Sequence, residues 1–119
     1  MIICFTSEKD NLNSLLSSRF EESPYFIFFD PENEDLEILK HQQGLLNGLE
    51  AAHLVADRRP DLVITGNIGP AAFDFLKASG IKIASGIFGL SVKEALNRYQ
   101  EGKIKEVKQI FGAGKGRLI

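Results

Sequence analysis

The sequence predicts a three-layer α/β fold built on a mixed, five-stranded sheet. Two observations predict it. The first 40 residues hold three β-prone segments, with a turn signal between the second and the third. From residue 47 onward, helical and strand-like apolar segments alternate, which is typical of βαβ units and a parallel sheet. A chain of 119 residues, 44% of them hydrophobic, is long enough to form one such domain with its own core.

The N-terminal half is expected to supply the antiparallel strands. Ile2–Ser7 is a short apolar run, and Tyr25–Phe29 is β-prone because of its aromatic side chains. Leu36–Lys40 roughly alternates apolar and polar residues, as a half-buried strand does. Asp30–Asn33 between the last two segments is a turn signal. These two segments are therefore predicted to form an antiparallel hairpin.

The first helix is predicted to begin near Asn47. Asn47 followed by Glu50 resembles a capping box, with Asn in place of Ser or Thr. The helix should stop at Arg59 because Pro60 follows it. Apolar residues recur at helical spacing over this stretch: Leu45, Leu49, Ala52 and Ala56.

Two strands and a helix are predicted next. Leu62–Ile64 reads as a buried strand, and Ile81–Ala84 as the following one. Pro70 suits the first position of the intervening helix, and Gly80 suits the position after its end. One face of that helix should carry the apolar residues Ala72, Phe75 and Leu76.

The last helix has the clearest start signal. Ser91 and Glu94 have capping-box spacing, and Gly102 marks the end. Its apolar face is expected to comprise Ala95, Leu96 and Tyr99. We expect one domain over residues 1–111 and a flexible tail over residues 112–119, since the glycine-rich tail lacks the Ser or Thr and the following helix that a phosphate loop requires.

The segment from Thr65 to Pro70 is the main candidate for a binding site. It follows a strand, contains two glycines, and opens a helix at Pro70, so its free backbone N–H groups and the helix dipole favour an anion. Thr65, Gly66, Asn67 and Gly69 are the predicted binding residues. The alternative is that the glycines only permit a tight turn and close packing of strand and helix.

Three side chains are candidate metal ligands. Cys4 is the only thiol; it lies in an apolar segment, where core packing competes with binding of a soft metal. His41 follows the third strand and opens a loop that can face the same edge as the glycines, which makes it the better ligand candidate of the two histidines. His53 lies next to the apolar stripe of the first helix and is expected either on its polar face or as a half-buried imidazole with its hydrogen bonds made, rather than as a ligand. The chain has too few Cys and His residues for a closed zinc site.

Charge and cysteine usage indicate the compartment and the partners. Residues 1–50 carry ten acidic and three basic side chains, whereas residues 51–119 carry six and eleven. This polarity can steer an anionic ligand toward the C-terminal half, or can simply reflect solvated faces. A single cysteine, no leader signal and no apolar run of membrane-spanning length predict a cytoplasmic protein that binds neither membranes nor nucleic acid.

Several segments together resemble the dinitrogenase iron–molybdenum cofactor biosynthesis family. The most specific is the Thr-Gly-x-Ile-Gly-Pro-x-Ala element at residues 65–72. The resemblance also covers Arg19–Phe26, Ala51–Leu54, Val63–Phe73, Gly80–Ile83, Val92–Leu96 and Gly102–Ile104. It implies a ribonuclease H-like fold and a small protein that carries iron–sulphur or molybdenum-containing clusters.

The resemblance has one departure. Many members have His-Phe-Gly before the second strand, where this chain has Arg19, Phe20 and Glu21. Arginine does not ligate metal at neutral pH because it stays protonated, but it pairs with anions. The resemblance therefore implies that an anionic metal–sulphur cluster, or its precursor, is held by Arg19, His41 and the Thr65–Gly69 loop. Cluster-assembly proteins are the implied partners.

We expect a binding protein and no enzyme. A ribonuclease H-like nuclease needs a carboxylate from the first strand, and Ile2–Ser7 contains none. No catalytic triad or activated cysteine is apparent either. Two alternatives to the cluster carrier stay open. The glycine-rich edge can bind a phosphorylated metabolite or a nucleotide, or the chain can associate with itself, as a homodimer, through an exposed sheet edge.

Overall fold

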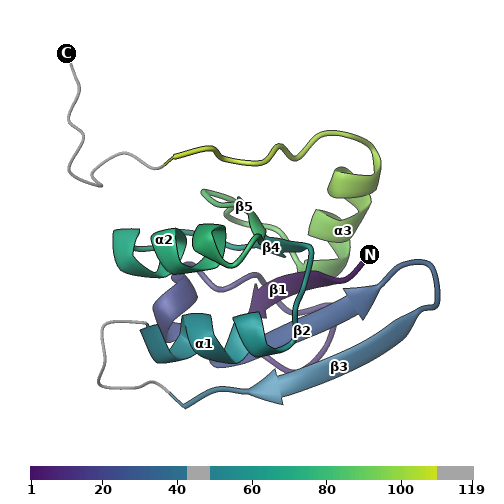
Figure 1. Cartoon of the computed structure of the whole chain (residues 1–119). Coiled ribbons are helices and arrows are strands. Elements are labelled where there is room, and N and C mark those ends of the chain that lie inside the picture. The colour runs from purple at the N-terminus through teal and green to yellow at the C-terminus, as the bar shows by residue number, and fades with distance from the viewer. Residues whose placement is uncertain (43–48, 110–119) are drawn as a thin grey trace.

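The computed structural model in Figure 1 describes residues 1–42 and 49–109. The predicted five strands and three helices are all present, which confirms the α/β class. In chain order the elements are β1 (Ile3–Ser7), the short 3₁₀ helix η1 (Phe20–Glu22), β2 (Tyr25–Asp30), β3 (Asp35–Lys40), α1 (Leu49–Asp57), β4 (Leu62–Ile64), α2 (Pro70–Ala78), β5 (Lys82–Ala84) and α3 (Val92–Gln100).

The sheet is mixed, as expected, with strand order β3-β2-β1-β4-β5. β2 pairs antiparallel with both β1 and β3, so the predicted hairpin is confirmed. β4 lies parallel to β1 and to β5. The carboxyl ends of β1, β4 and β5 therefore meet at one edge of the sheet. In open α/β sheets this is the edge outside which ligands bind.

Helices cover both faces of the sheet and make three layers (Figure 1). Helices α1 and α2 lie together on one face, over buried side chains of β1, β4 and β5, which include Cys4, Val63 and Ile83. Helix α3 lies on the opposite face, where Val92 and Ala95 pack into the second core cluster. The predicted capping box of α3 is formed, because the Ser91 hydroxyl accepts from the Glu94 N–H at 3.0 Å.

The buried face of α1 differs from the predicted one. The sheet side of α1 carries Ala51, Ala52 and Val55, all fully buried, whereas Leu49 at the first turn is exposed. Helix α1 packs against α2 and η1, where small side chains suit a close contact, so burial follows this packing rather than the size of the apolar residue. The predicted cap at Asn47, the apolar Leu45 and the predicted tail over residues 112–119 lie outside the described residues.

Cys4 is a core residue. It lies on β1 with no exposed surface, and burial raises the pKa of its thiol well above the usual range. Core packing therefore accounts for this residue, and metal binding at Cys4 has no support in the geometry. Among the residues that the structure describes, no helix is long and apolar enough to cross a membrane.

The burial of Cys4 can be tested by thiol labelling. We expect the native protein to react with a thiol reagent only as fast as it opens, because the thiolate is the reactive form and the sulphur has no contact with solvent. Denatured protein should react at once and give one thiol per chain. Rapid labelling of the native protein would contradict the burial.

Candidate functional site

The segment after β4 is held on one side by the chain just before η1. The Gly66 N–H donates to the Ser17 carbonyl at 3.2 Å, and the Asn67 N–H donates to the Ser18 carbonyl at 2.8 Å. The approach is so close that a Cβ on Gly66 would lie 2.5 Å from the Ser18 carbonyl oxygen. Glycine is therefore required here for packing, which is the alternative explanation that the sequence left open.

The same segment is held on its other side by the loop after β5. The Gly86 N–H donates to the Gly66 carbonyl at 2.8 Å, and the Ile87 N–H donates to the Thr65 carbonyl at 3.1 Å. The Thr65 side chain is fully buried, and its hydroxyl bonds with the Thr6 hydroxyl at 2.9 Å. Thr65 thus joins β1 to β4 inside the protein and presents no group at the surface.

The N-terminus of α2 already holds an anion, and that anion is the protein's own. Glu21 of η1 accepts a hydrogen bond from the Gly69 N–H, with 2.5 Å between Oε2 and the nitrogen. Gly69 is the N-cap of α2 and Pro70 is its first residue, so the predicted geometry is present. A carboxylate at this position is stabilised by the helix dipole. An external anion at this helix end would have to displace Glu21.

Arg19 and Asn67 are brought together at the surface. Their backbones form an isolated parallel β-bridge, and the Phe20 N–H donates to the Asn67 carbonyl at 2.8 Å. Both side chains are exposed, and the Arg19 side chain keeps 63% of its surface. The Arg19 Nε lies 3.9 Å from a carboxylate oxygen of Glu22, a loose pair in solvent. Of the predicted binding residues, these two present side chains to solvent.

His41 lies in a different environment, beneath the surface at the end of β3. It is 6% exposed, and its ring centroid lies 5.2 Å from that of Phe26. The centroid of Phe26 in turn lies 5.3 Å from that of Phe20. The ring of Phe26 thus lies between His41 and Phe20, the residue after Arg19.

The two ring nitrogens of His41 differ. Nδ1 lies 2.8 Å from the Ser23 carbonyl oxygen, which can only accept, so Nδ1 carries a proton and, in the neutral imidazole, Nε2 has the lone pair. Within the described residues, Nε2 is the one buried side-chain polar atom without a hydrogen-bond partner. An Nδ1–H bonded to a backbone carbonyl, with Nε2 available, is the arrangement typical of metal-ligating histidines.

The other candidates offer no metal site. His53 is exposed on α1, with its ring 4.2 Å from that of Phe75, as expected for the polar side of the helix. Over residues 1–42 and 49–109, no group of three His, Cys, Asp or Glu side chains could hold a metal ion. The role of Glu21 was not predicted from the sequence. Gly69 and Pro70 predicted an anion at the start of α2, but they did not indicate that the anion is a side chain of the protein itself.

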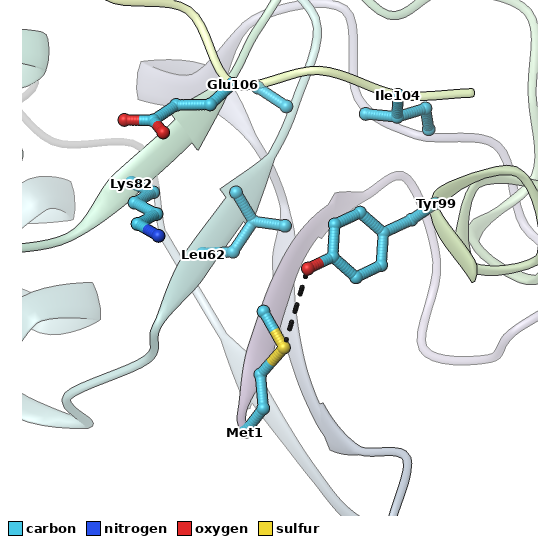
Figure 2. A pocket seen from close by; sticks show the side chains of 7 residues that line it. Met1, Leu62, Lys82, Tyr99, Ile104 and Glu106 are labelled. Atoms are coloured by element: carbon cyan, nitrogen blue, oxygen red, sulfur yellow. Dashed lines mark hydrogen bonds between the residues drawn. The ribbon is translucent and has the colours of Figure 1, made fainter. Parts of the chain in front are cut away.

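A small cavity lies at the opposite end of the parallel strands (Figure 2). It is lined by Met1, Leu62, Lys82, Ala84, Tyr99, Ile104 and Glu106, with a volume of about 160 Å³. The Tyr99 hydroxyl lies 3.6 Å from the Met1 sulphur across the cavity. The Glu106 carboxylate forms ion pairs with Lys77 and Lys108. The two ammonium groups lower the pKa of Glu106 against the opposing effect of desolvation. This volume is below the roughly 300 Å³ at which ligand pockets start.

Comparison with known proteins identifies the family. The pattern described as dinitrogenase iron-molybdenum cofactor matches residues 1–102, most of the chain. The chain belongs to this family. Two solved structures share its fold. The apo form of the orange protein from Desulfovibrio gigas is 28% identical, with 91% of this chain and 93% of that chain covered and a TM-score of 0.86. Curated protein sequences gave no match.

The second solved structure is a putative NifB protein from Thermotoga. It is 27% identical, covers 95% of this chain and 98% of its own, and has a TM-score of 0.83. Both similarities extend over nearly the whole of each chain, so the mixed sheet with helices on both faces is the fold that this family shares with them.

The close contact at Gly66 can be tested by adding a methyl group. We expect Gly66→Ala to lower the free energy of unfolding by roughly 1–3 kcal/mol or more, because the new Cβ meets the Ser18 backbone, which cannot turn aside. Gly69→Ala is the matched control: its Cβ meets only the flexible end of Glu21, at 2.8 Å. We expect this control to cost about 1 kcal/mol or less, for the weaker N-cap. Urea unfolding of both variants measures the difference, and equal losses would argue against the packing constraint.

Proposed function

We propose that this protein is a small carrier that holds an anionic metal–sulphur cluster or its precursor, passes it to cluster-assembly proteins, and catalyses no reaction of its own. Membership of the iron-molybdenum cofactor family supports the class of cargo. The observation that carries the proposal is His41, a buried imidazole with its tautomer fixed by Ser23 and with Nε2 unpartnered. We assign Nε2 of His41 as the protein's ligand to the cargo.

The donor set fits a cluster better than a bare metal ion. The described residues offer no group of three ligands, and Cys4, the only thiol of the chain, is fully buried. A cargo that brings its own sulphide ligands needs few from the protein, whereas a bare ion needs about four. Because His41 is nearly covered, cargo binding requires a local opening around its ring.

The backbone N–H groups of Gly66, Asn67 and Gly69 are hydrogen-bonded within the protein. We therefore assign the attraction for an anionic cargo mainly to side chains. Arg19 supplies an exposed, permanently charged guanidinium, and Asn67 supplies an amide beside it. We propose that Arg19 acts at a distance, as a positive charge that favours the approach of an anion, because the ring of Phe26 separates its neighbour Phe20 from His41.

Anaerobic reconstitution with iron, sulphide and molybdate tests the proposal, read by visible absorbance and by metal content per chain. We expect the wild-type protein to take up metal and His41→Asn to lose at least about tenfold in affinity. Asparagine keeps a donor for the Ser23 carbonyl but has no counterpart of Nε2. The matched control is His53→Asn, which removes the exposed histidine of α1 and should bind like the wild type.

Salt separates the role of Arg19 from that of His41. We expect Arg19→Gln to weaken cargo binding at low ionic strength and to have little effect at high salt, because exposed charges are screened over about 10 Å at 0.1 M. A wild-type protein that stays colourless and free of metal would overturn the carrier function. Equal loading of wild type and His41→Asn would overturn the role of His41 alone.

A further inference from the structure

Strand β3 is an open edge of the sheet. It is the outermost strand on its side, and six of its residues pair with β2 without interruption. The opposite edge is protected: β5 has three residues, and the Val107 N–H donates to the Ile83 carbonyl at 2.7 Å, so the chain after α3 covers it (Figure 1). Edge strands left open in this way are templates for pairing with another chain.

The direction of the backbone groups of β3 follows from one hydrogen bond. The His41 N–H donates to the Pro24 carbonyl, which makes this pair a hydrogen-bonded one in the antiparallel ladder. Hydrogen-bonded and non-bonded pairs alternate along such a ladder. The N–H and C=O groups of Leu36, Ile38 and Lys40 therefore point away from β2, toward the open side.

Two of these residues, Leu36 and Ile38, form an exposed apolar strip within the part of the chain that the structure describes. Ile38 lies opposite Ile27, whose side chain belongs to the core on the α3 face, so Leu36 and Ile38 lie on that face too. Helix α3 packs near β1, at a distance from β3 (Figure 1). Leu36 is 48% exposed and Ile38 is 38% exposed. The strip has no proline and no bulge, two of the features that usually protect an edge.

The charges on the hairpin are complementary to those on a second copy. The turn end of β3 is acidic, with Glu32, Glu34 and Asp35, and the other end carries Lys40. Antiparallel pairing of two β3 strands places Lys40 of each copy beside the acidic turn of the other. We propose that two copies of this chain pair through β3 and continue the sheet across a two-fold axis. This inference is independent of the proposed cargo.

The sequence of β3 also selects the register. A two-fold axis perpendicular to the sheet requires facing residues to lie on the same face, which leaves two central registers. Centring on Glu37 places two carboxylates directly opposite each other, an unfavourable arrangement. Centring on Ile38 places two isoleucines opposite each other and Leu36 opposite Lys40. The second register uses all three outward-pointing residues and forms about six hydrogen bonds between the copies, since each bonded pair exchanges two.

Sedimentation velocity of the full chain tests the pairing. We expect a species of twice the 13.2 kDa chain mass at high concentration, and a monomer for Ile38→Lys, in which two ammonium groups meet on the axis. Phe88→Lys is the matched control, because Phe88 is 53% exposed but lies in the loop after β5; this variant should still dimerise. A wild-type protein that is monomeric at about 1 mM, or an Ile38→Lys variant that dimerises like it, would overturn the proposal.

Cysteine cross-linking tests the register without depending on a destabilising change. Under mild oxidation we expect Ile38→Cys to form a covalent dimer, since facing residues of a bonded pair have their Cα atoms about 5.5 Å apart, within the disulfide range. Glu37→Cys should remain largely uncross-linked. Cys4 is buried and does not compete. Cross-linking through Glu37→Cys but not through Ile38→Cys would overturn the register that we propose.

Discussion

The fold depends on the contact between the backbones of Gly66 and Ser18. At this point the chain before η1 comes too close to the end of β4 for any side chain, and the two segments exchange hydrogen bonds. The contact closes the carboxyl edge of the parallel strands and connects that part of the sheet to the antiparallel part. It also fixes η1, which places Phe20 in the core and the carboxylate of Glu21 at the start of α2.

Much of the fold could be predicted from the sequence because its signals are local. The hairpin turn after Asp30, the proline that begins α2 and the capping box of Ser91 and Glu94 each lie within a few residues of the structure that they specify. The buried face of α1 was predicted less well. Spacing predicted Ala52 correctly but also placed Leu49 on this face, whereas the structure exposes Leu49 and buries Ala51 and Val55 beside Ala52.

The candidate site could be predicted only in part, for a physical reason. A strand, a glycine turn and a helix that starts with proline predict an anion at the helix N-terminus, whatever its source. Here Glu21, 48 positions before Gly69, fills that place. Likewise, Arg19 and Asn67 meet only because the Ser17–Phe20 segment lies against the loop after β4. Contacts between distant segments leave no periodic pattern in the sequence.

The backbone N–H groups of Gly66, Asn67 and Gly69 are hydrogen-bonded to other parts of the protein, and this changes what the family relationship implies for this chain. A preformed nest of free N–H groups would bind many small anions with little selectivity. With these three N–H groups bonded within the protein, we assign recognition to two side chains: the imidazole of His41, with its unpartnered nitrogen, and the exposed guanidinium of Arg19. A cargo bound in this way must contain a metal that binds a nitrogen ligand and must carry an overall negative charge. These two requirements narrow the range of possible cargoes.

The open edge and the proposed ligand are neighbours, because His41 directly follows β3. In the register centred on Ile38, Asp35 of the second copy lies opposite His41, on the same face of the sheet. This pairing places the second chain beside the His41 ring, whereas cargo binding requires a local opening around that ring. Self-association and cargo binding would then oppose each other, and by linkage the opposition is reciprocal. Cargo loading should shift the sedimenting species toward the monomer, so one experiment that measures metal content and mass together examines both sites.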